Sequence, residues 1–153
     1  MRNRGLWSRS PRRRQAKRTS PRRRCSKRTS PRVWRGVLSI AGDGNCLFRA
    51  LTWPDDAQNH ARARADVVAH LRRHWSEVYA PFSDAPCDAY CDHMARPGVW
   101  GGEMELRAFA DVFCVRVHVY GNDGVHIASY GPRNTHDTRR VRYARGHYDR
   151  LSP

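Results

Sequence analysis

Residues 41–51, AGDGNCLFRAL, join a glycine-containing turn to an apolar segment that starts at Cys46. The pattern predicts a short helix over 46–53 with Cys46 in its first turn. The first amides of a helix have no partner inside it, and the positive end of the helix dipole favours a thiolate. Glycines allow backbone angles that other residues resist, so amides of this turn can converge on one point and stabilise an oxyanion. A cysteine taken alone is more often a small buried residue, so a catalytic role depends on partners elsewhere.

A thiol nucleophile needs a histidine to accept its proton and a carboxylate or amide to orient that histidine. Among the eight histidines, His147 stands in RGHYDRL (145–151), which predicts a strand. Asp149 follows two residues later, so both side chains lie on one face of that strand. A His-x-Asp pair alone is more often incidental, and it gains meaning only together with Cys46.

The other apolar patterns predict an α+β fold, a mixed α/β layer with helices packed on a small, mostly antiparallel sheet. A helix over 57–79 has an apolar stripe formed by Ala61, Ala65, Val68, Leu71, Trp75 and Val78. Further helices are expected over 87–95 and 102–113. Strands are expected over 33–40, 114–120, 125–130 and 139–151, with GNDG (121–124) as a hairpin turn.

The positive charge is confined to the N-terminus. Fifteen of the 29 Lys and Arg residues lie within 1–36, which contain no Asp or Glu, and the other 14 balance the 14 acidic residues. Repeats of ten residues, SPRRRQAKRT (10–19) and SPRRRCSKRT (20–29), contain almost no apolar side chains, so we expect a disordered tail over 1–32 and a folded domain over 33–153. Residues 1–35 would suit an import receptor or non-specific nucleic-acid binding, or simply a solvated tail.

Several classes of protein are disfavoured by composition. No run of roughly 18 apolar residues predicts a membrane span, and no apolar region predicts a secretory signal. An odd number of cysteines, five, argues against a disulfide framework and for a reducing compartment. We expect an intracellular monomer in the nucleus, the cytoplasm or both.

A metal site formed by Cys87, Cys91 and His93 is also disfavoured. Zinc usually takes four ligands, and Cys91 and His93 point to different faces of the expected helix. A helix that packs Tyr90 and Met94 inward is the simpler interpretation.

Three segments resemble, in order, the signature blocks of the ovarian tumour (OTU) family of cysteine proteases: GDGNCLFRAL (42–51), WGGEMELRAFADVFCVRVHVY (100–120) and HYD (147–149). The resemblance spans essentially all of 37–153. It implies an OTU-like cysteine protease fold and a deubiquitinase that cleaves after the C-terminal glycine of ubiquitin or a ubiquitin-like modifier. Metals and cofactors are not implied.

Carried over by position, the resemblance makes Cys46 the nucleophile and His147 the general base. Asp43 matches an acidic residue of the catalytic loop, and Asp149 matches the residue that orients the histidine. Which of the two aspartates completes the triad stays open.

Two further groups of residues match the family blocks. Gly44 and Asn45 belong to the loop whose backbone would supply oxyanion donors. The block Trp100, Gly101, Gly102 and Glu103 implies a part-structural role and a part in lining the substrate channel, with the structural role favoured for Trp100 and Glu103. The segment TWPDDAQNH (52–60) is short for the family, which leaves linkage preference open.

An alternative of a different class is a catalytically inactive OTU-like binding module with an RNA- or DNA-binding tail. Cys46, His147 and Asp149 occur together in the chain, which argues against such decay because the loss of one would suffice. A viral or parasite effector that removes ubiquitin from host proteins would use the same chemistry as the enzyme.

Overall fold

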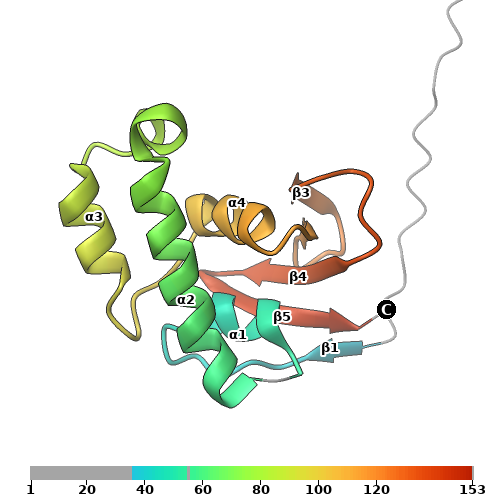
Figure 1. The fold of residues 1–153 in the computed structure, drawn as a ribbon. Coiled ribbons are helices and arrows are strands. Elements are labelled where there is room, and N and C mark those ends of the chain that lie inside the picture. The colour runs from blue at the N-terminus through green and yellow to red at the C-terminus, as the bar shows by residue number, and fades with distance from the viewer. Residues whose placement is uncertain (1–35, 55, 153) are drawn as a thin grey trace, which may run out of the picture.

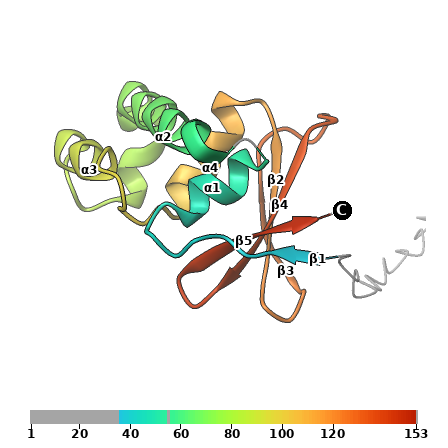
Figure 2. The ribbon, with the colours of Figure 1, turned by 90° about the horizontal axis from the view of Figure 1, so that it is seen from below.

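A computed structural model describes residues 36–54 and 56–152, without the side chains of 56–58. The described part is a five-stranded mixed sheet with α1–α4 on one side of it (Figures 1 and 2). The predicted α+β layer is therefore confirmed. The expected basic tail over 1–32 lies outside the described residues.

The elements follow the predicted order closely. The helices are α1 (Cys46–Thr52), α2 (Asp56–Arg73), a π-helical turn η1 (Trp75–Tyr79), a 3-10 turn η2 (Ala80–Phe82), α3 (Cys87–Met94) and α4 (Glu103–Val112). The strands are β1 (Gly36–Leu38), β2 (Arg116–Tyr120), β3 (His126–Tyr130), β4 (Thr138–Ala144) and β5 (His147–Ser152). No helix within the described ranges is long and apolar enough to cross a membrane.

The sheet has the strand order β1-β5-β4-β2-β3. Neighbours pair antiparallel except β2 and β4, which run parallel. At one edge β1 pairs with the end of the chain, Gly36 opposite Ser152, so the start of the described domain lies beside its end (Figure 1). This pairing places the loop that leads from β1 to Cys46 next to β5.

The prediction of one closing strand over 139–151 is wrong, because the segment forms the hairpin β4–β5. Arg145 (φ 50°) and Gly146 (φ 80°) both adopt positive φ, as a two-residue turn that matches the strand twist requires. The usual Asn-Gly or Asp-Gly signal is missing, so the sequence pattern concealed the turn. His147 is consequently the first residue of β5, immediately after a tight turn.

The predicted stripe of α2 is also partly wrong. Ala61 and Ala65 are exposed, and the helix ends at Arg73 before the π-helical turn. The buried face consists of Ala63, Arg64, Val67, Val68 and Leu71. The true stripe was missed because it contains a buried arginine, which an apolar pattern does not count.

Helix α1 lies at the centre of the fold. It packs against α2 on one side and against β5 and β4 on the other. Leu47, Phe48 and Leu51 are almost completely buried there. An apolar helix enclosed in this way, lying against β5 (Figure 2), holds its first residue, Cys46, at a fixed place.

Candidate active site

Cys46 begins helix α1 and is 6% exposed. The preceding residue, Asn45, occupies the N-cap position, but its side chain makes no capping hydrogen bond to the first turn. The first amides of α1 are thus not covered by that side chain and remain available to a developing negative charge.

Asp149 holds His147 by a direct hydrogen bond. Nε2 of His147 lies 3.1 Å from Oδ1 of Asp149, and both residues are on the same face of β5, as expected for a spacing of two. The same Oδ1 accepts the amide of Ile40 at 3.1 Å, and Oδ2 accepts Arg142 at 2.6 Å. Asp149, 4% exposed, is therefore saturated with donors and rigidly placed.

The surroundings of Asp149 favour its ionised form. Burial by itself would raise the pKa of the carboxyl group, but the hydrogen bonds from Arg142 and Ile40 and the proximity of His147 outweigh it. The net result is a pKa below the ordinary value, so the carboxylate is charged at neutral pH and can stabilise an imidazolium.

The loop before Cys46 passes close to the other nitrogen of the same imidazole. A Cβ built on Gly42 would lie 4.0 Å from Nδ1 of His147. Tyr148, next to His147, is buried in the same core cluster as Cys46. With Nε2 committed to Asp149, Nδ1 is the ring nitrogen directed toward the loop that leads to the thiol.

Asp43 is part of that loop but contacts Arg49 rather than His147. Its Oδ2 accepts Arg49 at 2.8 Å, and its Oδ1 accepts the amide of Asn45 at 3.0 Å. The hydrogen bond from Arg49 holds the pKa of Asp43 well below its usual range. In this structure Asp43 shapes the loop, and the contact with the histidine belongs to Asp149.

The side chain of Asn45 connects the loop to helix α2 and to the segment before α4. Its Oδ1 accepts Arg64 at 2.9 Å and the amide of Gly98 at 2.9 Å. Gly44 has φ +79° and lies so close to Gly98 that a Cβ on Gly44 would be 1.9 Å from the Gly98 carbonyl oxygen. Glycine is required here both for the backbone angle and for the close approach.

The segment before α4 contacts the loop before Cys46, helix α1 and the β4–β5 turn. A Cβ on Gly101 would be 2.6 Å from Leu47 in α1, so this backbone packs directly on the helix that begins at Cys46. The indole of Trp100 lies against the β4–β5 turn, with Cζ3 2.9 Å from a Cβ built on Gly146. Trp100 is nevertheless 68% exposed, so most of its surface faces solvent beside the β4–β5 turn.

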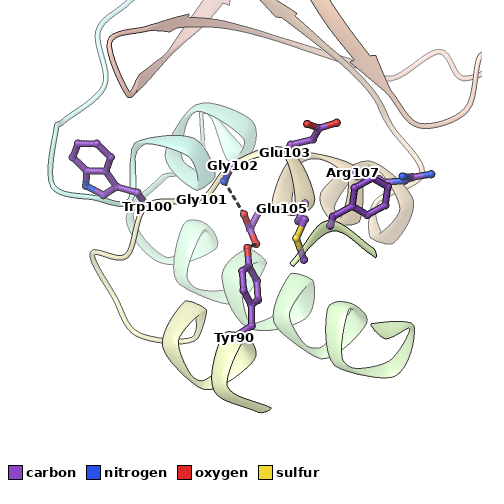
Figure 3. Close-up of a pocket in the computed structure, with 9 residues that line it drawn as sticks. Tyr90, Trp100, Gly101, Gly102, Glu103, Glu105 and Arg107 are labelled. Atoms are coloured by element: carbon purple, nitrogen blue, oxygen red, sulfur yellow. Dashed lines mark hydrogen bonds between the residues drawn. The ribbon is translucent and has the colours of Figure 1, made fainter. Parts of the chain in front are cut away.

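A pocket of about 430 Å³ continues from Trp100 along the start of α4 (Figure 3). Glu105, 1% exposed, forms its support, with Oε2 accepting the Gly102 amide and Oε1 accepting the Tyr90 hydroxyl, both at 2.7 Å. The first four residues of the second sequence block all line the pocket: Trp100, Gly101, Gly102 and Glu103. In Figure 3 Tyr90 rises from α3 toward Glu105, while Glu103 points away from that pair.

Three residues of this arrangement were not anticipated from the sequence: Arg64, Arg142 and Gly98. Arg142 stands directly opposite Asp149 in the β4–β5 register, which only the unpredicted hairpin creates. Arg64 lies three, four and seven residues before Val67, Val68 and Leu71, which places it on the same helix face. That spacing was the one signal in the sequence that Arg64 would be buried. Gly98 carried no signal.

The described residues contain no group of three or more His, Cys, Asp or Glu side chains able to hold a metal. Cys91 is completely buried, and burial followed by the neighbouring Cys87 raises its pKa to about 11. Met94 is buried, and Tyr90 packs against the core, as expected. A thiol at the start of a helix and an imidazole bonded to a carboxylate form an arrangement that can support acyl transfer.

Comparison with known proteins agrees with this chemistry. Residues 41–150 match the family described as OTU-like cysteine protease. An ovarian tumor domain-containing deubiquitinating enzyme 7 from Arabidopsis thaliana is 30% identical over 107 residues, which cover 67% of this chain and 28% of the relative. The chain spans less than half of the length of the curated relatives it matches.

Two solved structures share the fold. The OTU domain of OTUD1 superposes with a TM-score of 0.65 at 23% identity, covering 76% of this chain and 85% of that one. An ovarian tumor domain solved in complex with ubiquitin gives 0.68 at 21% identity, covering 76% and 69%. At these identities the likeness concerns the fold.

Proposed function

The chain belongs to the family of OTU-like cysteine proteases, and we propose that it is a thiol-dependent deubiquitinase. Its substrate would be the bond after the C-terminal glycine of ubiquitin or of a ubiquitin-like modifier. The named deubiquitinase relative and the fold neighbour solved with ubiquitin support this choice. The observation that carries the proposal is the His147–Asp149 hydrogen bond of 3.1 Å, which leaves Nδ1 beside the loop of Cys46.

In the proposed mechanism His147 removes the thiol proton of Cys46 through Nδ1. The thiolate attacks the carbonyl carbon of the terminal glycine, and the amides at the start of α1 and of Gly44 receive the oxyanion. The Asn45 amide, which the family block also suggested, donates to Asp43 instead. The imidazolium then returns its proton to the leaving amine as the C–N bond breaks. Water, activated by the same histidine, hydrolyses the thioester and frees the enzyme.

We assign Asp149, rather than Asp43, to orient His147. Asp149 contacts the ring and is held by two further donors, whereas Asp43 is engaged by Arg49 and Asn45. A fixed carboxylate on Nε2 keeps Nδ1 as the proton acceptor and stabilises the imidazolium that forms. Asp43 contributes by holding the loop.

The pocket along α4 is the proposed channel for the C-terminal tail of the modifier. It starts at the exposed face of Trp100, beside the β4–β5 turn, and includes the carboxylate of Glu103. The lining also contains Arg107 and a second carboxylate, Glu105, which is already bonded to Tyr90 and Gly102. The aromatic side chains and the Glu103 carboxylate suit a flexible tail that contains arginine, as the ubiquitin tail does.

The first test is covalent labelling by a ubiquitin probe with a thiol-reactive C-terminus. Wild type should be labelled, Cys46→Ala should not, and Cys114→Ala should behave as wild type because that exposed thiol lies outside the site. Labelling only by the probe of a related modifier would replace ubiquitin as the substrate. Silence of a folded wild-type protein with every modifier would reject the enzyme and favour the binding module.

A further inference from the structure

Arg64 is a buried arginine, 3% exposed, in the middle of α2. Its Nη2 donates to the carbonyl of Gly44 at 3.3 Å, to Oδ1 of Asn45 at 2.9 Å and to the carbonyl of Val99 at 2.8 Å. Its Nη1 donates to the carbonyl of Met94 at 3.0 Å. One guanidinium thus joins the catalytic loop, the end of α3 and the segment before α4.

The guanidinium also packs on the nucleophile helix. Its central carbon lies 4.4 Å from the ring centroid of Phe48, two residues after Cys46. Cation–aromatic stacking of this kind restrains a side chain that its hydrogen bonds already hold in one plane. Arg64 therefore fixes the loop and the helix relative to each other.

A need for stability alone does not explain this side chain. Burying a charge is costly, and an apolar residue of similar volume often serves a core at least as well. The acceptors of Arg64 are uncharged, namely three backbone carbonyls, the side-chain amide oxygen of Asn45 and the thioether of Met94. Burial lowers the pKa of Arg64, against the opposing influence of Glu105, Asp43 and Cys46.

The geometry of its bonds indicates a more specific role. Oδ1 of Asn45 accepts Arg64 and Gly98 together, so the amide group of Asn45 cannot rotate. The bond to the Gly44 carbonyl orients the peptide plane between Gly44 and Asn45. That plane determines where the last loop amides before Cys46 point.

We infer that Arg64 is a positioning residue that holds the loop of residues 42–45 in the conformation required for catalysis at Cys46. The inference rests on the proposed thiol mechanism, but it concerns this chain's own loop and not the identity of the modifier. Arg64 touches neither the substrate nor the reacting atoms. It acts through Asn45 and Gly44.

The informative variant is Arg64→Lys, which keeps the charge and loses the planar fork. A lysine ammonium is a single donor centre and cannot reach the three separate segments together. Arg72→Lys is the matched control, because Arg72 lies eight residues along the same helix and makes surface ion pairs with Asp88 and Asp92. Both variants are assayed at a temperature at which each is folded.

Hydrolysis of ubiquitin with a fluorogenic C-terminal amide gives the first readout. We expect kcat of Arg64→Lys to fall by about 10–100-fold with KM little changed, because misplaced catalytic groups cost turnover rather than binding. Arg72→Lys should match wild type. A wild-type kcat in Arg64→Lys, or a loss confined to KM, would overturn the inference.

Alkylation by iodoacetamide gives a second readout that needs no ubiquitin. Trypsin releases Cys46 in the peptide 36–49, and the exposed Cys114 serves as an internal reference. The rate at Cys46 relative to Cys114 should fall in Arg64→Lys and stay constant in Arg72→Lys. An unchanged or higher ratio counts against the role of Arg64.

These readouts separate the proposed ubiquitin substrate from the positioning role of Arg64. A wild-type protein that ignores ubiquitin while Arg64→Lys still lowers the alkylation ratio would reject the substrate and keep the positioning role. If Arg64→Lys does not fold, Asn45→Ala removes the acceptor instead. That variant should show the same loss of kcat, and a normal kcat there would refute the pathway through Asn45.

Discussion

Replacing Gly44 with alanine should displace the catalytic loop rather than merely strain the local backbone. Gly44 has φ +79°, and a Cβ on it would lie 1.9 Å from the carbonyl oxygen of Gly98. Both sides of that contact are backbone, so relief requires movement of the segment whose Gly98 amide binds Asn45. Gly124 offers the matched control, since it has φ +77° and no atom of the described residues within 4 Å of its own Cβ position.

The expected loss of stability has two parts, the cost of alanine at a positive φ and the cost of overpacking against Gly98. Either alanine costs about 1 kcal/mol of unfolding free energy for its positive φ. Gly44→Ala adds about 1–3 kcal/mol for overpacking against a backbone that cannot yield easily. At about 4 °C per kcal/mol for a domain of this size, Tm should fall by about 4 °C in Gly124→Ala and by about 8–16 °C in Gly44→Ala.

Thermal unfolding followed by circular dichroism measures Tm, and cleavage of fluorogenic ubiquitin measures kcat/KM. Below both melting transitions, kcat/KM of Gly44→Ala should be lower by at least about 100-fold, since a displaced loop no longer presents its oxyanion donors. Gly124→Ala should cleave as wild type does. If the two variants melt together and cleave alike, the contact between Gly44 and Gly98 does not hold the site.

Three further substitutions test other parts of the site. Asp149→Asn should lower kcat by about 10²–10⁴-fold and Asp43→Asn by less, and the reverse order in steady-state assays would make Asp43 the orienting residue. Because the pKa of Asp149 is depressed in the folded state, its stabilisation is present above the unfolded pKa of about 3.9 and is lost as pH falls through the folded pKa. The Tm difference between wild type and Asp149→Asn should therefore shrink from pH 7 to pH 3, and a constant difference would contradict the depressed pKa. Tyr90→Phe removes a 2.7 Å hydrogen bond to the buried Glu105 and should lower the free energy of unfolding by about 1–2 kcal/mol. An unchanged Tm would mean that the hydrogen bond from the Gly102 amide is sufficient to stabilise the Glu105 carboxylate.

Much of the fold could be predicted because its signals are local. The start of α1 at Cys46 follows from a turn next to an apolar run, and α3, α4, β2 and β3 lie within two residues of the predicted bounds. The pairing of His147 with Asp149 on one face follows from the alternation of a strand. Each of these depends on residues close together in the chain.

Other features escaped prediction because their local signals are weak or misleading. The β4–β5 turn uses Arg145 at positive φ, where Asn or Asp would have announced a hairpin. The buried face of α2 includes Arg64, whose charge is tolerated only because carbonyls from three distant segments accept its protons. A pattern based on hydrophobicity assigns such a residue to the surface.

The sequence by itself identified the candidate nucleophile Cys46, the candidate base His147 and two acidic candidates, because residue type, spacing and family blocks specify them. It could not choose between Asp43 and Asp149, since both are carboxylates near a catalytic block. The tertiary structure separates them by contact, giving Arg49 to one and His147 to the other. The reactive side chains are visible in the sequence because they depend on residue type alone. The orientation of a loop depends on contacts such as those of Arg64, which exist only once the chain has folded.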